Sequence, residues 1–111
     1  MNSTLELQKI ATIEPSGHIS AANVNEFQRQ LSDIARSHQY SALLIDMSKV
    51  EFLDSAGLMV LVRAFREAQS LGRRLSICSV SPQVRIILEL TQLDRVFEIF
   101  ESRVAFESAV N

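Results

Sequence analysis

Apolar and polar residues alternate in two stretches near the start of the chain, residues 4–7 and residues 11–15. This alternation is typical of strands that are buried on one face. The two stretches could form a hairpin, with antiparallel strands, or a single bent strand. After a break at Ser16 and Gly17, residues 17–20 are expected to continue the second strand.

The pattern then changes to the three- and four-residue spacing of an amphipathic helix. We expect this helix to begin near Asn23, which is a favourable N-cap, and Glu26 could complete a capping box. The residues expected to face the core share one helical stripe: Val24, Phe27, Leu31, Ile34 and Ala35.

Two almost continuous apolar stretches, residues 42–47 and residues 75–80, predict buried strands. Such strands are usually covered on both faces, as in sheets with helical crossovers. Between them, residues 55–71 predict a long helix, and Gly72 can end it in a left-handed cap. Met59 and Val60 lie outside its predicted inward stripe, so they either pack against another strand or loop or form an apolar patch near Ser55. The stripe consists of Leu58, Leu61, Val62, Phe65 and Ala68.

The last third of the chain predicts a helix, a strand and a second helix. Ser81 can cap the first of these helices, and Pro82 suits its first position because the missing N–H costs nothing there. Residues 96–100 predict a short strand, and residues 102–110 predict a terminal helix. The residues expected to be inward in the two helices are Val84, Ile87, Leu88, Val104, Ala105 and Ala109.

Two strands followed by alternating helices and strands imply parallel pairing through right-handed crossovers. A length of 111 residues is that of one domain, so we expect residues 1–111 to form a single α/β domain.

Composition argues against several classes of function. The net charge is −2 with no block of like charges, which makes nucleic acid a poor partner. No apolar run approaches the ~20 residues of a membrane-spanning helix. The N-terminus lacks the pattern of a secretion signal, so we expect a cytoplasmic protein. The lone Cys78 is expected to be a small buried residue, and neither a metal site nor a cofactor is predicted.

The candidate chemistry lies at Asp54 and Ser55, where the long apolar helix begins. Phosphate-loop, dinucleotide and nucleophile-elbow motifs are missing from the sequence. A serine nucleophile needs a base, but His18 is expected in a loop or strand and His38 at a helix C-terminus, so catalysis is not predicted. Asp54 or Ser55 could cap the helix, and Ser55 could also be an accessible site of phosphorylation.

Residues 43–62, LLIDMSKVEFLDSAGLMVLV, strongly resemble the signature of STAS-domain proteins, the anti-sigma factor antagonists. That signature is a strand followed by Val-x-Phe-Ile-Asp-Ser-Ser-Gly-Leu. Residues 17–31 resemble the family's Gly-x-Leu-Asp segment, and residues 81–100 resemble its Asn-Pro-x-Val segment and the following turn. The resemblance implies a STAS-like α/β domain with a mixed, mainly parallel sheet and about four helices packed mostly on one side.

The same resemblance implies a regulatory protein and not an enzyme. In this family the unphosphorylated protein binds a serine kinase that is also an anti-sigma factor, and this frees the sigma factor. The kinase inactivates the antagonist by phosphorylating the serine after the Asp, and a serine phosphatase restores it. By position the phosphoacceptor is Ser55. The predicted partner-binding residues are Ser20, Asp54, Ser55, Ala56, Gly57, Leu58 and Met59.

Two positions depart from the family pattern. Ala56 replaces the second serine of the pair, and Ser20 replaces the Asp of Gly-x-Leu-Asp, an acid that lies near the phosphorylated serine in the family. Three alternatives therefore stay open. They are a STAS interaction or scaffold domain that is not phosphorylated, an accessory subunit of a transporter, and a small hydrolase that uses Ser55.

Overall fold

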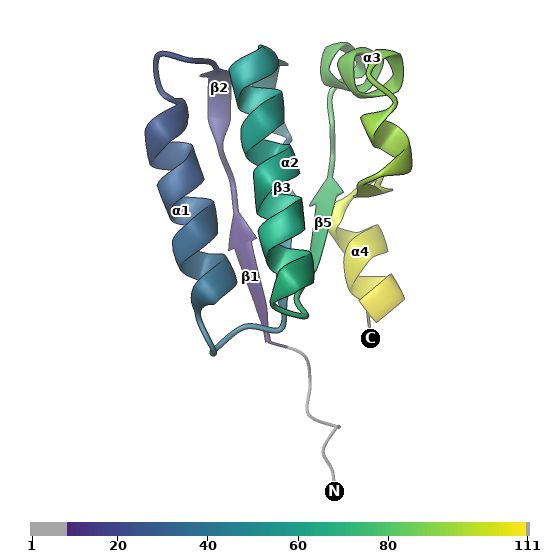
Figure 1. The fold of residues 1–111 in the computed structure, drawn as a ribbon. Coiled ribbons are helices and arrows are strands. Elements are labelled where there is room, and N and C mark those ends of the chain that lie inside the picture. Colours follow the sequence, from purple (N-terminus) through teal and green to yellow (C-terminus); the bar gives the residue numbers. More distant parts are fainter. Residues whose placement is uncertain (1–8, 111) are drawn as a thin grey trace, which may run out of the picture.

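The computed structural model describes residues 9–110, in which parallel strands alternate with helices (Figure 1). The strands are β1 (Ile10–Ile13), β2 (Ser16–Ile19), β3 (Ala42–Asp46), β4 (Lys49–Leu53), β5 (Arg74–Cys78) and β6 (Glu98–Phe100). The helices are α1 (Val24–Arg36), α2 (Ser55–Ser70), α3 (Pro82–Leu90) and α4 (Arg103–Val110), with a 3-10 turn, η1 (Leu93–Arg95). The strand predicted at residues 4–7 lies outside the described residues.

All strand pairs within residues 9–110 are parallel, in two groups. The main sheet has the order β1-β3-β5-β6, and β2 and β4 form a separate two-stranded ribbon. The second strand predicted from the sequence is divided between these groups, because β1 pairs with β3 and its continuation β2 pairs with β4. Pro15 lies at the division, and a proline cannot donate a hydrogen bond to a strand ladder.

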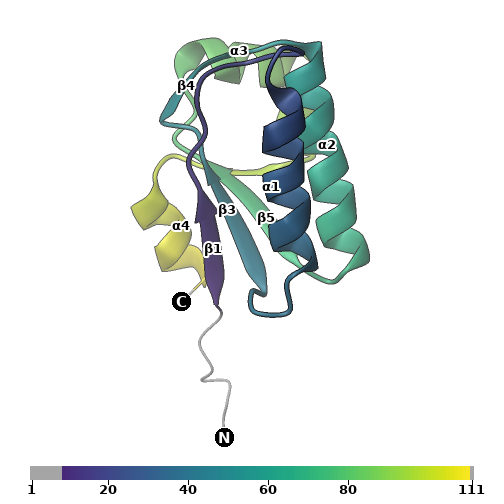
Figure 2. The same ribbon diagram turned by 90° about the vertical axis from the view of Figure 1, so that its left-hand side faces the viewer.

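The helices cover the two faces of the main sheet unequally (Figure 2). Helices α1 and α2 lie side by side on one face, α3 lies at the end of the molecule near β4, and α4 lies on the opposite face. The larger apolar core contains side chains of α1, α2 and α3. A smaller core beside α4 consists of Leu44, Cys78 and Phe106. The predicted packing of the helices mostly on one side is therefore confirmed.

Cys78 is completely buried in this smaller core, as predicted. Burial raises the pKa of its thiol, because the buried environment disfavours the thiolate. The side chain therefore behaves as a small apolar residue and not as a reactive nucleophile.

Strand β4 is an element that the sequence analysis does not predict. Its buried residues, Val50 and Leu53, are three positions apart, so the strand lacks the regular alternation of a half-buried strand. The register with β2 explains this, because a β-bulge leaves Glu51 without an opposite residue. The bulge shifts the register of the later part of β4 by one residue. The sequence of β4 therefore lacks the alternation of buried and exposed residues from which a strand is predicted.

The alternatives left open for Met59 and Val60 are divided between the two residues, since Met59 is exposed and Val60 is only 2% exposed. Val60 packs against another element, but this element is the helix α1 and not a strand or loop, and Val60 lies with Leu31 between the two helices.

The inward residues predicted for the terminal helix are wrong. In α4, Val104 and Ala109 are exposed, and the buried residue is Phe106, which packs edge-to-face on Phe100. The single large side chain of Phe106 fills the space beneath this short helix. The spacing of the small apolar residues, from which the inward face was predicted, does not indicate this.

Candidate functional site

The candidate site is formed by the two loops that follow the ribbon strands. Because β2 and β4 are parallel, with Ile19 opposite Leu53, both strands end at the same edge. Residues 20–23 lead from β2 into α1, and Asp54 alone connects β4 to α2. The Asp54 N–H donates to the Ile19 carbonyl at 3.2 Å, which extends the pairing of the strands to the start of α2.

Asp54, and not Ser55, is the N-cap of α2, and its carboxylate joins the two loops. Oδ1 accepts a hydrogen bond from the Gly57 N–H at 3.0 Å, and Oδ2 accepts one from the Ala21 N–H at 3.1 Å. The hydrogen bond from Gly57 is the main cause that lowers the pKa of Asp54, and the bond from Ala21 adds to it. The Asp54 carboxylate is therefore ionised at neutral pH and is held between the two loops.

Gly57 allows α2 to begin close to the end of β2. A Cβ atom at this position would lie 2.8 Å from the Ile19 carbonyl oxygen and 3.2 Å from side-chain atoms of Ile19 and Leu53. Gly57 is buried, so it positions the first turn of α2 and presents no side chain to a partner. Sequence reasoning placed Gly57 in the partner-binding set because of its motif, and did not anticipate this close approach.

Asn23 holds the loop before α1, but through contacts other than the predicted capping box. Asn23 precedes the helix as predicted, but its Oδ1 accepts from the Ser20 N–H at 2.9 Å and its Nδ2 donates to the His18 carbonyl at 2.8 Å. Glu26 instead pairs with Arg29 at 3.4 Å, so the capping box is absent. Ser20 Oγ accepts from the Ala22 N–H at 3.3 Å, which makes Ser20 a turn residue that precedes Ala21, the donor to Asp54.

Ser55 is the exposed first residue of α2. Its side chain makes no hydrogen bond within residues 9–110, whereas both oxygens of the neighbouring Asp54 are engaged. Ala56 is half-buried, Leu58 is half-buried against the core, and the Met59 side chain is 46% exposed. The helix start therefore presents a free hydroxyl beside a fixed carboxylate, with an exposed apolar residue one turn further along.

Neither histidine is placed to activate Ser55. His18 lies on β2, where its Nε2 is 3.3 Å from Glu51 Oε1, and His38 is an exposed residue that follows α1. The part of the chain that the structure describes contains no cluster of His, Cys, Asp and Glu suited to a metal ion. The geometry is that of an exposed serine hydroxyl and not of a nucleophile paired with a base.

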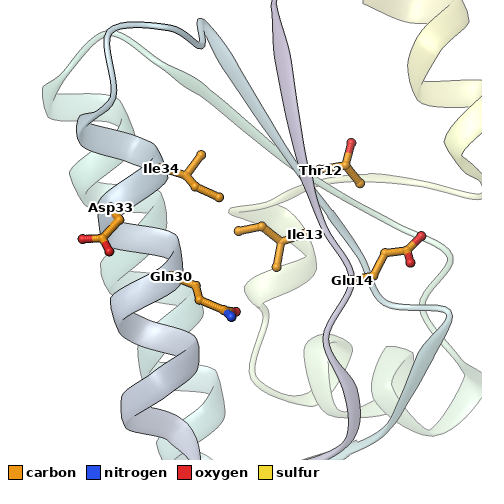
Figure 3. A pocket seen from close by; sticks show the side chains of 6 residues that line it. All are labelled: Thr12, Ile13, Glu14, Gln30, Asp33 and Ile34. Carbon is orange, nitrogen blue, oxygen red and sulfur yellow. The ribbon is translucent and has the colours of Figure 1, made fainter.

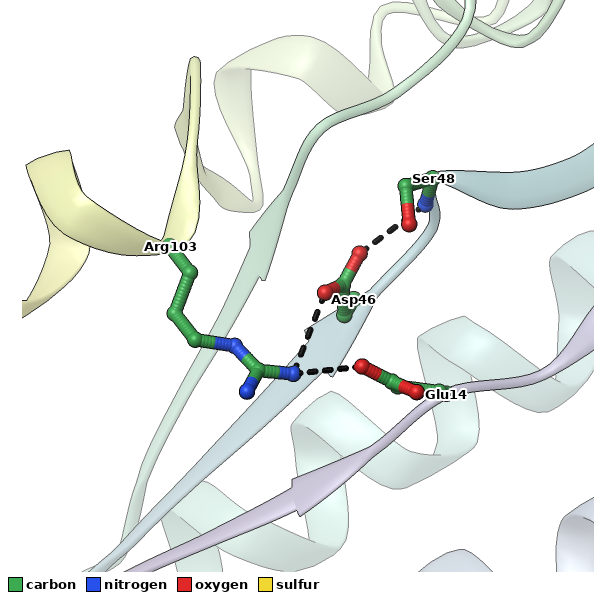
Figure 4. Close-up of polar contacts among 4 residues, drawn as sticks. All are labelled: Glu14, Asp46, Ser48 and Arg103. Atoms are coloured by element: carbon green, nitrogen blue, oxygen red, sulfur yellow. Dashed lines mark hydrogen bonds and ion pairs between the residues drawn. The ribbon is translucent and has the colours of Figure 1, made fainter.

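A second polar cluster lies at the carboxyl end of the main sheet (Figure 4). Arg103 from α4 reaches Glu14 at 2.7 Å and Asp46 at 3.1 Å, and the Ser48 N–H donates to Asp46 at 3.0 Å. Burial tends to raise the pKa of Asp46, but the hydrogen bonds from Ser48 and the charge of Arg103 lower it overall. These contacts fasten α4 to the sheet through one terminal nitrogen of the Arg103 guanidinium, whereas its buried Nε has no hydrogen-bond partner within the described residues.

A shallow hollow lies between β1 and α1 (Figure 3). Ile13 points into it from the strand, and Gln30 and Ile34 point toward it from the helix, whereas Asp33 points away. It lacks the converging polar groups that orient a small ligand, so it is not a candidate binding site. Among the described helices, none has the length and apolar character needed to cross a membrane.

Comparison with known proteins adds to this picture. The sequence model of the STAS domain family matches residues 3–105. A candidate anti-sigma factor antagonist of Thermotoga neapolitana is 25% identical over 96 residues, which cover 86% of this chain and 85% of that protein. The anti-sigma F factor antagonist of Paenibacillus polymyxa is 21% identical over 107 residues, covering 94% and 92%.

The same likeness is found in three dimensions. The crystal structure of a candidate anti-sigma factor antagonist from Thermotoga maritima matches with a TM-score of 0.84 and 25% identity, covering 91% of this chain and 86% of that chain. This confirms the predicted α/β STAS fold. Both relatives are described as anti-sigma factor antagonists, the first as a candidate, in agreement with the prediction of a regulatory protein.

Proposed function

The chain belongs to the STAS domain family, and from this we propose that it is an anti-sigma factor antagonist switched by phosphorylation of Ser55. In its unphosphorylated form it binds a serine kinase that also acts as an anti-sigma factor, so that the sigma factor is released. Phosphorylation of Ser55 by the kinase ends this binding, and a serine phosphatase restores the chain. These steps take place in the cytoplasm.

The observation that carries the proposal is the free, exposed hydroxyl of Ser55 beside the fixed carboxylate of Asp54. A kinase needs an acceptor hydroxyl that it can reach, and Ser55 has no internal partner to lose within the described residues. The two oxygens of Asp54 already occupy the Gly57 and Ala21 N–H groups at the helix start. A phosphate on Ser55 therefore has to compete with Asp54 for these donors or project away from the protein.

Phosphorylation would act mainly through charge. It adds about −1.5 to −2 charges at neutral pH, next to a carboxylate that is ionised and has only backbone partners. In an interface closed around the neutral serine, this charge is repelled and must lose its hydration. A cost of roughly 3–4 kcal/mol weakens binding a few hundredfold, since each 1.4 kcal/mol is a factor of ten.

The predicted partner-binding residues take different roles in this proposal. Ser55 and Met59 contact the kinase directly, because both are exposed, and Ser20 and Ala56 contact it at the edges of the site. Asp54 holds the two loops in register. Gly57 and Leu58 support the helix start from the core side. Ser20 contributes a hydroxyl in place of the family's acid, so the loop before α1 carries one negative charge fewer.

The test compares Ser55→Ala and Ser55→Glu proteins as baits in lysate of the source cells, with captured proteins identified by mass spectrometry. We expect the alanine form to retain a serine kinase and the glutamate form to bind it at least about tenfold more weakly. The purified kinase should transfer phosphate from ATP to the wild-type chain at Ser55 and leave Ser55→Ala unmodified.

Ser41→Glu is the matched control, because Ser41 is exposed and lies at the opposite end of β3 from the Ser55 loop. It adds the same charge and should leave the affinity for the kinase unchanged. If both Ser55 baits retain the same partner, or if neither retains a kinase, the switch is refuted. The protein would then be a constitutive STAS interaction domain, the alternative that the serine at position 20 favours.

A further inference from the structure

Strand β4 presents an aromatic side chain outward at a place where the strand pattern would turn it inward. Val50 is buried, and a regular strand returns to the same face two residues later, at Phe52. Phe52 is nevertheless 44% exposed, and of the six phenylalanines in the chain it is the one that is exposed. This arrangement needs a structural cause.

The cause is the β-bulge at Glu51. In the ladder Gly17 is opposite Val50 but the next residue, His18, is opposite Phe52, so Glu51 is the extra residue. The bulge turns Phe52 to the outer face of the ribbon and returns Leu53 to the core, where it is 1% exposed. Gly17, at φ +75°, supplies the left-handed backbone on the facing strand beside this irregularity.

The exposed ring has polar neighbours. Its centroid is 6.0 Å from that of the His18 ring, with the planes at 57°, and His18 contacts Glu51 at 3.3 Å. Both of these neighbours are well exposed. An aromatic residue surrounded by hydrated polar groups is the composition found at the centre and rim of protein interfaces.

The position of Phe52 relative to Ser55 limits what can cover it. The two residues are three positions apart in the chain, so their Cα atoms are at most about 11 Å apart. A typical interface buries about 800 Å² on each partner, a patch of roughly 16 Å radius. The distance of at most about 11 Å is shorter than this radius. A kinase whose interface is centred on Ser55 can therefore also contact Phe52.

We propose that the outer face of the β2–β4 ribbon, with Phe52 as its aromatic anchor and His18 and Glu51 as its rim, is part of the surface that binds the kinase. This inference rests on the proposed function. It adds a second contact region, which contributes affinity for the kinase that does not depend directly on phosphorylation. Ser55 provides the switch. The bulge is the device that makes this contact available.

The test uses the full chain and the purified kinase that Ser55→Ala retains. Phe52→Ala should raise the Kd for the kinase about tenfold or more, as truncation of an interface anchor does. At saturating chain concentration Ser55 should still be phosphorylated, so the change lies in KM and not in the maximal rate. Val104→Ala is the control, because Val104 is a 69% exposed apolar residue on α4, and its Kd should stay within about twofold of wild type.

A second measurement does not depend on the alanine variant. Because Cys78 is buried, a thiol introduced by Phe52→Cys can be labelled selectively with an environment-sensitive fluorophore. Addition of kinase should shift the emission to the blue at position 52 and leave a label at Val104→Cys unchanged. Equal Kd for wild type and Phe52→Ala, with no shift at position 52, would overturn the inference and leave the Ser55 switch standing.

Two other outcomes also decide against it. If sedimentation shows that Phe52→Ala dissociates a self-associated form of the chain and has no effect on kinase binding, the ribbon face binds a second copy. If Ser55→Ala retains no kinase at all, the proposed function and this inference both fail.

Discussion

Asp46 and Asp54 are both aspartates at strand ends, but their carboxylates have different kinds of partners. Asp46, the last residue of β3, faces the guanidinium of Arg103, which comes from 57 positions further along the chain. Within residues 9–110, Asp54, directly after β4, accepts hydrogen bonds from the Gly57 and Ala21 N–H groups and faces no cation. Both aspartates have a lowered pKa. Burial opposes this shift at Asp46, and backbone hydrogen bonds are its main cause at Asp54.

The difference separates a structural site from a surface site. Arg103 balances part of the charge of Asp46 and Glu14 and closes that edge of the sheet under α4 (Figure 4). The charge of Asp54 has no ion-pair partner within residues 9–110, so its negative field extends to the exposed Ser55 hydroxyl. A charge paired by a cation serves the fold, whereas a charge fixed by neutral N–H groups remains available to act on whatever binds beside it.

The largest loss of stability is expected where the Asp54 site depends on close packing. Gly57→Ala places a Cβ atom 2.8 Å from the Ile19 carbonyl oxygen, which belongs to the backbone and cannot rotate away. Overpacking of this kind exceeds the gain of about 1 kcal/mol in helix propensity, so we expect a net destabilisation of about 2 kcal/mol. Urea unfolding followed by circular dichroism measures this change. An unchanged or higher midpoint would mean that helix propensity dominates and that the approach of α2 to β2 is not tight.

A smaller loss is expected at the other carboxylate. Arg103→Met removes the cation from Asp46 and Glu14 while it keeps a long apolar stem over the sheet. Because the pairs are partly exposed, we expect a destabilisation of about 1 kcal/mol, between the values for surface and buried ion pairs. Thermal unfolding at low and high salt measures it, and high salt should reduce the difference.

Arg66→Met is the matched control for this variant, since Arg66 is an exposed arginine on α2. Its stability should match that of the wild type. Kinase binding by Arg103→Met should also be unchanged, because the cluster lies apart from the Ser55 loops. A loss of binding without a loss of stability would show that the two sites are not separate.

These two regions also show what a sequence can and cannot predict. The buried strands, the Ser81 cap of α3 and the start of α2 follow from short-range patterns, and the structure confirms them: Ser81 accepts from the Val84 N–H at 3.2 Å. Asp54 and Ser55 could be found because a capping acid before an apolar helix is a local signal. The role of Asp54 as a link to Ala21, 33 positions away, is not local and was not foreseen.

The missed features share one cause, which is dependence on contacts between distant segments. Val60 is buried because α1 covers it, and Gly57 is required because Ile19 approaches it. The bulge at Glu51 disrupts the alternation from which β4 would have been predicted. Each of these depends on the packing of a partner element, which hydrophobic periodicity along one segment does not contain.

The smallest effect on stability is expected for Asp54→Asn. This variant tests the difference between Asp54 and Asp46 most directly. The amide keeps one oxygen acceptor and replaces the other with a donor, so either the Gly57 or the Ala21 hydrogen bond is lost. We expect a fall of about 2–4 °C in Tm, as for a weakened helix cap. Kinase affinity should fall roughly five- to tenfold, because the loop before α1 is no longer held against α2. The same change at the exposed Asp94 should alter neither quantity.

The pH dependence distinguishes loss of this hydrogen bond from a general change in charge. The pKa of Asp54 is lowered in the folded protein, so its ionised form stabilises the fold above its ordinary pKa of about 3.9. That contribution is lost as the pH falls through the still lower pKa of the folded state. The difference in Tm between wild type and Asp54→Asn should therefore be constant well above the ordinary pKa of Asp54 and shrink as the pH falls below it. A difference that stays the same at acid pH would mean that Asp54 does not act through its charge, and the contrast with Asp46 would then rest on geometry alone.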